Sequence, residues 1–133
     1  MADLVVRPVA RGDYDQWLPL WDGYNAFYDR AGPTALPLDV TQMTWARFFD
    51  AYEPVHAFVA ETDGRLIGLV HYLFHRSTTA IAPTCYLQDL FTAAEARGKG
   101  VGRGLWVRFR GSHSGTKGWP GSARADVHGR GFM

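Results

Sequence analysis

The sequence predicts an α/β domain in which helices flank a mixed, mostly antiparallel sheet, in the order β-α-α-β-β-β-α. Three observations predict this fold class. Apolar residues recur at three- and four-residue steps in two early stretches, three strand-like segments follow, and a glycine-rich connection leads to another helix. A chain of 133 residues, 47% of them hydrophobic, is large enough for one core. Its single cysteine, Cys85, excludes a disulfide scaffold and a Cys-based zinc site.

The N-terminal stretch is expected to form a strand and then a helix. Residues 4–8 read as a short strand that ends at Pro8, because proline has no N–H group to donate to a neighbouring strand. In the helix that follows, Asp13 or Asp15 is the expected N-cap, and Pro19 predicts either a kink or a later start. The apolar face of this helix consists of Trp17, Leu20, Trp21, Tyr24, Phe27 and Tyr28.

A loop and a second helix come next. The composition of residues 30–37, with one glycine and two prolines, predicts the loop. Thr41 can cap the helix that follows, since its hydroxyl can accept a hydrogen bond from a backbone N–H group of the first turn. The apolar positions of this helix are Trp45, Phe48, Phe49 and Tyr52.

The pattern then changes to that of strands. Residues 57–62 and 65–75 read as two strands joined by an Asp-Gly dipeptide, which is typical of hairpin turns. A further strand is expected over residues 86–91. The polar, glycine-containing connection over residues 92–99 then leads to a helix that should start near Gly100.

Charge is distributed unevenly along the chain. Residues 1–96 carry twelve acidic and six basic side chains, whereas residues 97–133 carry one acidic and eight basic side chains. An acidic body with a basic end suggests two partners, one cationic and the other a phosphate-bearing anion. No apolar run approaches the roughly 20 residues of a membrane span, and Asp3 and Arg7 interrupt any signal-peptide core. We therefore expect a cytoplasmic protein that does not engage a membrane.

The most informative segment is RGKGVG, residues 97–102. A P-loop is excluded because Lys99 is followed by Gly100 instead of serine or threonine. The dinucleotide-binding fingerprint is excluded because Arg103 and Leu105 stand where its third glycine would be needed. Between a strand and a helix, the backbone N–H groups and basic side chains of this segment still suit an anion such as pyrophosphate. The alternative interpretation is an ordinary glycine-rich turn.

This segment resembles the acetyl-CoA loop of the GCN5-related N-acetyltransferases (GNAT), whose Arg-x-x-Gly-x-Gly motif is filled here by Arg97, Gly100 and Gly102. The preceding YLQDLF, residues 86–91, is similar to the Tyr-Leu-Glu-Asp-Phe-Phe strand of the diamine branch of that family. Val6-Arg7-Pro8 and GLVHYLF, residues 68–74, also fit its opening strand and third strand. The resemblance covers about residues 4–106 and points to the diamine or polyamine and histone-type branch.

The resemblance implies that an acetyl group passes from acetyl-CoA to a primary amine of a small molecule or protein, by direct attack. It implies that backbone N–H groups of Leu90, Phe91 and Thr92 bind the pantetheine arm and the acetyl carbonyl oxygen. Pyrophosphate would be held by the backbone of Arg97, Gly98, Lys99, Gly100, Val101 and Gly102. No metal is implied.

On the acceptor side, the resemblance implies that Asp89 binds the cationic amine or accepts its proton through water. Gln88 stands where the diamine branch has glutamate, and because an amide cannot act as a base, this argues against diamine chemistry in particular. The acidic body is consistent with a polyamine, an aminoglycoside or a protein lysine. Tyr24 and Tyr28 could line the acceptor cleft, although their helical spacing is also typical of core or dimer packing.

The chain departs from the family beyond about Trp106, where it shows neither a two-residue nor a 3.6-residue period. The resemblance implies a fifth strand, a helix and two more strands there, together with an asparagine and then a tyrosine that protonates the departing thiolate. The chain has one asparagine, Asn25, and no tyrosine after Tyr86. We therefore expect an incomplete acetyltransferase domain over residues 1–106, without its C-terminal strands, and an atypical Gly/Arg-rich tail over residues 107–133.

Several alternatives stay open at this stage. The tail is either a flexible basic segment or one that was not selected to complete this fold, for example because of a shifted reading frame. Acetyl transfer is then impaired, or a homodimer mate or another partner completes the sheet. The chain could also be a non-catalytic CoA-binding remnant. Nucleic acid is not the expected partner, but a basic surface could bind it through Arg108, Arg110, Lys117, Arg124 and Arg130.

Two other residue types receive structural interpretations. His71 and His75 are expected to lie about 13 Å apart on one strand, too far to share a metal ion, so packing within the strand is favoured. Cys85 is expected to be a small core residue and not a nucleophile.

Overall fold

The computed structural model describes residues 3–114 and 125–127. Its elements are β1 (Val5–Pro8), a 3₁₀ turn η1 (Arg11–Asp13), α1 (Tyr14–Phe27), η2 (Gly32–Thr34), α2 (Leu38–Arg47), β2 (Val55–Thr62), β3 (Arg65–His75), β4 (Thr84–Thr92), η3 (Ala94–Ala96), α3 (Val101–Ser114) and β5 (Ala125–Val127). The predicted α/β class, with a mostly antiparallel sheet flanked by helices, is confirmed.

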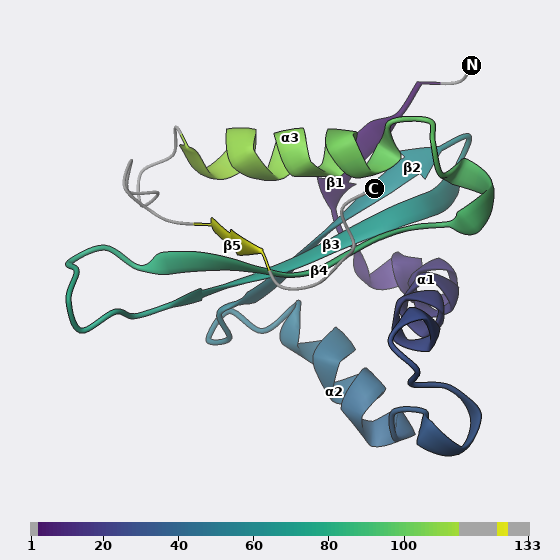
Figure 1. Cartoon of the computed structure of the whole chain (residues 1–133). Coiled ribbons are helices and arrows are strands. Elements are labelled where there is room, and N and C mark those ends of the chain that lie inside the picture. The colour runs from purple at the N-terminus through teal and green to yellow at the C-terminus, as the bar shows by residue number, and fades with distance from the viewer. Residues whose placement is uncertain (1–2, 115–124, 128–133) are drawn as a thin grey trace.

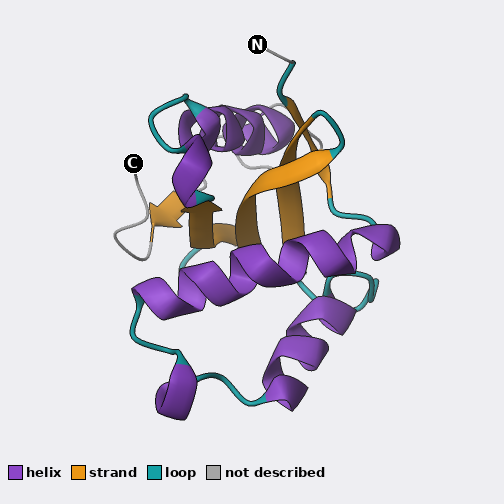
Figure 2. Cartoon of the chain, turned by 90° about the vertical axis from the view of Figure 1, so that its right-hand side faces the viewer, coloured by secondary structure: helices purple, strands orange, loops and turns teal. Residues whose placement is uncertain are grey.

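The sheet has the strand order β1-β2-β3-β4-β5. Strands β1 to β4 are antiparallel neighbours, and β5 pairs in parallel with the first half of β4, through Cys85, Tyr86 and Leu87. Helix α3 covers one face of the sheet, and α1 and α2 lie on the other side (Figure 1, Figure 2). This arrangement buries the sheet between two helical layers and, among the described residues, leaves the second half of β4 without a neighbouring strand on one side.

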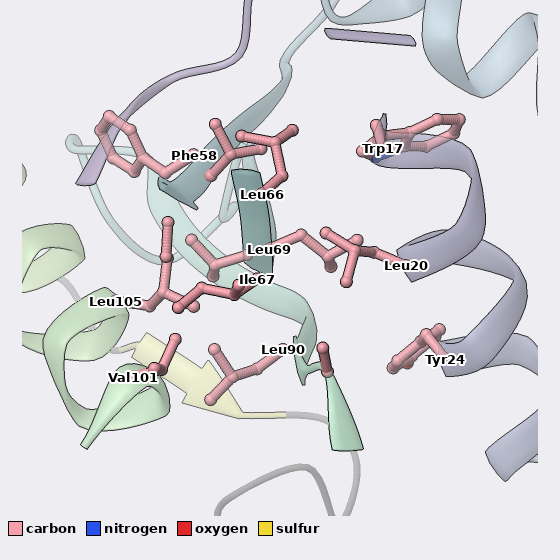
Figure 3. Close-up of a cluster of buried hydrophobic side chains, with 14 of the residues drawn as sticks. Trp17, Leu20, Tyr24, Phe58, Leu66, Ile67, Leu69, Leu90, Val101 and Leu105 are labelled. Carbon is pink, nitrogen blue, oxygen red and sulfur yellow. The ribbon is translucent and has the colours of Figure 1, made fainter. Parts of the chain in front are cut away.

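The core lies on both faces of the sheet. Figure 3 shows Val101 and Leu105 of α3 on one side and Trp17, Leu20 and Tyr24 of α1 on the other. Between them, the strands contribute buried side chains that include Leu66, Ile67, Leu69 and Leu90. The helical spacing that predicted α1 therefore corresponds to burial of one face, as expected for an amphipathic helix.

The close approach of α3 depends on a glycine in β3. A Cβ atom at Gly68 would lie 2.9 Å from Leu105 Cδ1 and 3.0 Å from Val101 Cγ1. These distances are shorter than van der Waals contact, so a side chain at this position would push α3 away from the sheet.

Two details of the predicted helices are wrong, and one of the two alternatives at Pro19 is excluded. Helix α1 begins at Tyr14, five residues before Pro19, so the later start is excluded. Thr41 is a buried residue inside α2, where its hydroxyl accepts a hydrogen bond from Trp21 Nε1 at 3.1 Å; it does not cap the helix. Tyr52 lies beyond the end of α2 and is 98% exposed, so it is not part of an apolar face.

The C-terminal region contains more regular structure than predicted. Helix α3 runs through Ser114, past the expected domain boundary at residue 106, although the sequence shows no helical period there. Strand β5 is also present, so one C-terminal strand that we expected to be missing is formed. Most of the tail lies outside the described residues, as do Lys117, Arg124 and Arg130 of the alternative nucleic-acid surface.

Candidate active site

The glycine-rich segment connects the end of β4 to the start of α3. Ala93 donates its backbone N–H to the carbonyl of Ile67 at 2.9 Å, which fixes the chain as it leaves the sheet. The Arg97 side chain then folds back: its Nε donates to the carbonyl of Thr92 at 3.2 Å, and its guanidinium lies 5.3 Å from the centre of the Phe91 ring. The Arg97 side chain therefore holds the loop against β4.

Two glycines in this segment have left-handed backbone conformations, which other residues adopt at a cost. The φ angles are +82° at Gly98 and +79° at Gly100, and a Cβ atom at either position would have no heavy atom within 4 Å. The backbone of the loop is thus open to the outside. Lys99 and Arg103 are exposed beside it.

The start of α3 supplies free hydrogen-bond donors. The N–H group of Gly104 donates to the carbonyl of Gly100 at 2.9 Å, and the N–H groups before it in the first turn are left for another acceptor. These donors, the positive end of the helix dipole and the two basic side chains fit a pyrophosphate group. The residues present therefore suit the anionic part of acetyl-CoA.

The edge of β4 beyond Leu87 has no neighbouring strand among the described residues, because β5 pairs only with Cys85, Tyr86 and Leu87. In an antiparallel pair, alternate backbone groups face the partner strand and the others face away. Some N–H groups within Leu90–Thr92 therefore point to the open edge. Leu90 and Thr92 are buried there and Phe91 is half-buried.

A β-bulge lies in the middle of this strand. His71 of β3 pairs with Asp89, and the next residue, Tyr72, pairs with Leu87, so Gln88 is an extra residue in β4. Bulges re-aim side chains and are frequent beside active sites. Here both Gln88 and Asp89 line the same cavity, which strict alternation along a strand would not allow.

Asp89 is held by a buried hydrogen-bond chain. Trp17 Nε1 lies 3.0 Å from His71 Nε2, and His71 Nδ1 lies 2.9 Å from Asp89 Oδ2. Because the indole N–H can only donate, His71 Nε2 must be the acceptor, so in the neutral ring Nδ1 carries the hydrogen and donates to Asp89. His71 is 2% exposed and Asp89 is 6% exposed.

The sequence did not single out His71 for this role. Packing was the expected function, and His75, its expected companion on the same face, is exposed. Both His71 and Asp89 were placed on strands, but their pairing depends on the register of β3 and β4. That register includes the bulge at Gln88, for which the sequence offers no clear indication.

Of the two tyrosines predicted to bind the acceptor, Tyr24 lies beside Asp89. Burial, followed by the negative charge of Asp89 and a side-chain hydrogen bond to it, raises the pKa of the Tyr24 phenol well above its usual value. Tyr28 is half-buried, with its ring centre 5.0 Å from that of Tyr24. The Arg30 guanidinium lies over both rings, 5.9 Å from Tyr24 and 5.4 Å from Tyr28.

A cavity of about 240 Å³ opens beside Asp89, between the sheet and the helices. Its polar lining consists of Thr44, Arg47, His71, Gln88 and Asp89, and its apolar and aromatic lining of Trp21, Phe48, Val55, Tyr72 and Leu73. Sequence reasoning identified Asp89 but missed Arg47, which is the last residue of α2. A lone basic residue at a helix end is common, so its type and position gave no indication of a site.

Other residues considered from the sequence have structural roles. Cys85 is fully buried, and burial raises the pKa of its thiol to about 12, which confirms it as a core residue. Within the described residues, no group of three or more His, Cys, Asp or Glu side chains is arranged to hold a metal ion. No helix in the described part of the chain has both the length and the apolar character of a membrane span.

Arg108, the first residue of the alternative nucleic-acid surface, packs against the sheet. Its Nε donates to the carbonyl of Val6 at 3.4 Å, and its guanidinium lies 5.7 Å from the centre of the Phe58 ring. This basic group is therefore engaged by β1 and β2.

Solved structures share this fold. Ribosomal-protein-alanine N-acetyltransferase from Brucella melitensis biovar Abortus 2308 aligns with a TM-score of 0.76 at 17% identity, over 96% of this chain and 81% of that chain. Aminoglycoside N-acetyltransferase AAC(6')-Iy, solved in complex with CoA, aligns with a TM-score of 0.70 at 17% identity, over 97% of this chain and 78% of that chain.

Sequence comparison gives a more specific result. The chain is 36% identical over 118 residues to D-amino-acid N-acetyltransferase HPA3 of Saccharomyces cerevisiae, a match that covers 85% of this chain and 70% of the relative. The family model for the acetyltransferase (GNAT) family matches residues 17–108, which include most of α1, the Asp89 strand and the glycine loop. The resemblance seen in the glycine motif is thereby confirmed at the level of the family: the chain belongs to the acetyltransferase (GNAT) family of enzymes.

Proposed function

We propose that this chain transfers an acetyl group from acetyl-CoA to a primary amine by direct attack, at the open edge of β4 beside Asp89. One observation carries the proposal: the loop that suits a pyrophosphate follows directly from the strand that holds Asp89. A buried carboxylate in β4 and an anion site in the loop that follows this strand can serve the two substrates of an acetyl transfer.

The glycine loop supports binding of the anionic cosubstrate. Backbone N–H groups over residues 98–102 would donate to the pyrophosphate oxygens, and Lys99 and Arg103 would offset their negative charge. Arg97 has a different role in this proposal, because its side chain is engaged with Thr92 and Phe91. Acetyl-CoA supplies a thioester whose carbonyl carbon can accept an amine.

The β4 edge supports polarisation of that carbonyl. N–H groups within Leu90–Thr92 that face the open edge can donate to the thioester oxygen, on which negative charge develops as the amine attacks. Fixed backbone donors need no reorganisation during the reaction. Loss of one such donor typically lowers the rate by about 10²- to 10³-fold in acyl-transfer enzymes.

Asp89 supports handling of the amine. A primary amine is mostly protonated at neutral pH and must lose a proton before it can attack. The Asp89 carboxylate can bind the ammonium group and accept its proton directly or through a water molecule. His71, which donates from Nδ1 to Asp89 Oδ2, would hold the carboxylate in position. Tyr24, a neutral phenol beside Asp89, and its neighbour Tyr28 remain proposed acceptor-binding residues, although neither is among the residues that line the cavity.

The acceptor is a separate question. The diamine or polyamine and histone-type branch stays a prediction, and the name of the yeast relative adds a D-amino acid as another candidate. Impaired turnover and a CoA-binding remnant also stay predictions, since the chain lacks a tyrosine after Tyr86.

Three expectations about the wider molecule are retained as proposals: a cytoplasmic location, a homodimer, and a division into an acetyltransferase domain over residues 1–106 and a tail over residues 107–133. The homodimer is supported by the open edge of β4, because unpaired backbone groups favour association. Sedimentation of the full chain with and without acetyl-CoA tests it, and a monomer under both conditions would exclude it.

The test of the function combines binding with turnover. The affinity of the full chain for acetyl-CoA is measured by titration calorimetry and compared with its affinity for acetyl-pantetheine, which lacks the pyrophosphate. We expect acetyl-CoA to bind in the micromolar range and to bind more tightly than acetyl-pantetheine, and a panel of primary amines to yield acetylated products. A folded chain that binds neither compound would contradict the proposal. Binding of acetyl-CoA without any acetylated product would show that the chain is a non-catalytic CoA-binding remnant.

A further inference from the structure

We infer that the acceptor is zwitterionic, an α-amino acid whose carboxylate is recognised by Arg47 while its amine lies at Asp89. The inference rests on the proposed function and names the substrate class for the same site. It starts from one feature of the cavity, which places a cationic and an anionic side chain on different walls. Arg47 comes from the end of α2 and Asp89 from the middle of β4.

The two charged groups are not partners of each other. Asp89 is paired with His71, through Oδ2 at 2.9 Å. Arg47 pairs with Glu53 at an N–O distance of 3.8 Å, which is longer than a hydrogen bond. The guanidinium therefore keeps donors available for a carboxylate, with which arginine forms strong paired hydrogen bonds. Asp89 also forms a side-chain hydrogen bond with Tyr24, and the lone pairs that remain on its carboxylate can accept from an ammonium group.

The cavity has room for an amino acid. Its volume of about 240 Å³ is many times the roughly 10–15 Å³ that a single water molecule needs on the same measure. Trp21, Phe48 and Tyr72 supply apolar wall for the amino-acid side chain, and the Thr44 hydroxyl can add a hydrogen bond.

The same charges disfavour the acceptors considered from the sequence. A polyamine that placed one ammonium group at Asp89 would bring a second cation near Arg47, which repels it. A lysine side chain carries no carboxylate beside its amine, and Arg47 would be left without a partner among the groups of the substrate. An amino acid satisfies both charges with two adjacent groups.

The experiment compares matched acceptors with acetyl-CoA. Phenylalanine, as each enantiomer, is set against phenethylamine, which lacks only the carboxylate, and alanine against ethylamine; spermidine represents the polyamines. We expect kcat/KM for one enantiomer of each amino acid to exceed that for its matched amine by about 10- to 100-fold, the range of a charged hydrogen-bonded contact. In Arg47→Gln this ratio should fall close to one.

Controls separate charge recognition from folding. Arg47→Lys keeps the charge and should keep part of the preference. Arg76→Gln makes the same change at an exposed arginine outside the cavity, and should leave the ratio unchanged. Circular dichroism establishes that each variant is folded. An equal kcat/KM for amino acid and amine, a preference for spermidine, or an unchanged ratio in folded Arg47→Gln would overturn the inference.

A binding measurement distinguishes failure of this inference from failure of the proposed function. The same amino acids and amines are titrated into the full chain, with the fluorescence of the chain, including Trp21 in the cavity wall, as the readout. If no amine is acetylated but an amino acid binds and Arg47→Gln abolishes that binding, the inference stands and the proposed function fails. If amines are acetylated and amino acids do not bind, the proposed function stands and the inference fails.

Discussion

At the scale of single residues, the candidate site depends on polar groups that are buried but paired. Trp17, His71 and Asp89 form a chain in which each hydrogen bond fixes the next group. Leaving one of these groups buried without a partner would cost about 1–3 kcal/mol. The chain therefore both stabilises the fold and holds the Asp89 carboxylate in one orientation at the cavity.

The first prediction concerns the carboxylate. Asp89→Asn keeps the size of the side chain but removes its negative charge and its ability to accept a proton. If Asp89 handles the amine as proposed, kcat/KM for amine acetylation should fall by about 10²-fold or more. Steady-state kinetics with acetyl-CoA and the best acceptor measures this change in kcat/KM.

Asp22→Asn is the matched control, since it makes the same change at an exposed residue of α1. Its activity should equal that of the unmodified chain. Full activity of Asp89→Asn would remove Asp89 from the reaction.

The second prediction concerns the His71 ring. Since Trp17 donates to Nε2, His71 should be the tautomer with hydrogen on Nδ1. Long-range ¹H–¹⁵N correlation spectra at neutral pH should show one protonated nitrogen, assigned to Nδ1. In Trp17→Phe, which removes the donor, Nε2 is released and the populations should shift from this tautomer. A hydrogen found on Nε2 in the unmodified chain would rule out the chain of hydrogen bonds.

At the scale of elements, the glycine loop joins the end of β4 to the first turn of α3. Its shape depends on left-handed conformations at Gly98 and Gly100, which cost other residues about 1–2 kcal/mol each. Because a Cβ atom at either position meets no atom within 4 Å, any effect of substitution must come from the backbone conformation and not from a clash.

The third prediction follows from this difference. Gly98→Ala and Gly100→Ala should each weaken acetyl-CoA binding by about tenfold or more, since the loop N–H groups leave their positions. Gly12→Ala is the control, because Gly12 also has open space around it but no left-handed conformation. Calorimetric titration of the three variants measures the effect. If Gly98→Ala and Gly100→Ala bound acetyl-CoA as tightly as Gly12→Ala does, this loop would not hold the anion.

A second link between elements ties β1 to the start of α1. Arg7 donates two hydrogen bonds to Asp13, at 2.8 and 2.9 Å, and a third to Glu61 at 3.0 Å. Asp13 also accepts from the backbone N–H of Ala10 at 2.7 Å. Asp13 therefore holds the predicted N-cap position of α1, but its carboxylate is used for Arg7 and the 3₁₀ turn.

The fourth prediction concerns stability at low pH. The hydrogen bonds from Arg7 lower the pKa of Asp13 in the folded chain below its value in the unfolded chain. Its contribution is therefore present at neutral pH, above the unfolded pKa of about 3.9, and is lost as pH falls through the lower folded pKa. Chemical denaturation from pH 7 to pH 2 should show Asp13→Asn losing less stability than the unmodified chain.

Asp15→Asn provides the comparison, because Asp15 is exposed in the first turn of α1. It should keep the pH dependence of the unmodified chain. If the stability of Asp13→Asn depended on pH as that of the unmodified chain does, the contact between Arg7 and Asp13 would not stabilise the fold.

At the scale of the whole molecule, the sequence predicted the elements that have strong local patterns. The turn at Asp63-Gly64, where both residues have positive φ, joins strands whose ends were predicted within two residues. The sequence did not predict the C-terminal part of α3, because its glycines interrupt the helical period. Strand β5 has only three residues and is defined by its pairing with β4.

The site shows the same division between local pattern and tertiary arrangement. Asp89 and the glycine loop could be predicted because they are contiguous motifs in the sequence. His71 and Arg47 could not, since they reach the cavity from β3 and α2 through strand register and helix packing. Tyr24 illustrates both outcomes: its helical spacing correctly indicated burial, and only the packing of α1 on β4 brings it beside Asp89.

The last prediction tests whether the packing of the whole domain positions the loop. Leu105 of α3 is fully buried above Gly68, and α3 begins at the proposed anion site. Leu105→Ala should lower the free energy of unfolding by about 2–5 kcal/mol, through lost apolar burial and the cavity that remains. Because the first turn of α3 is anchored by this contact, acetyl-CoA binding should also weaken at a temperature where the variant is still folded.

Val107→Ala is the matched change on the same helix, where Val107 is 58% exposed. It should alter stability by no more than about 0.5 kcal/mol and leave binding intact. Thermal unfolding with and without acetyl-CoA measures both quantities for each variant. If Leu105→Ala is destabilised but retains its affinity, the loop keeps its shape through contacts with β4 alone, chiefly those of Arg97 with Thr92 and Phe91. The position of α3 would then matter for stability and not for the cosubstrate.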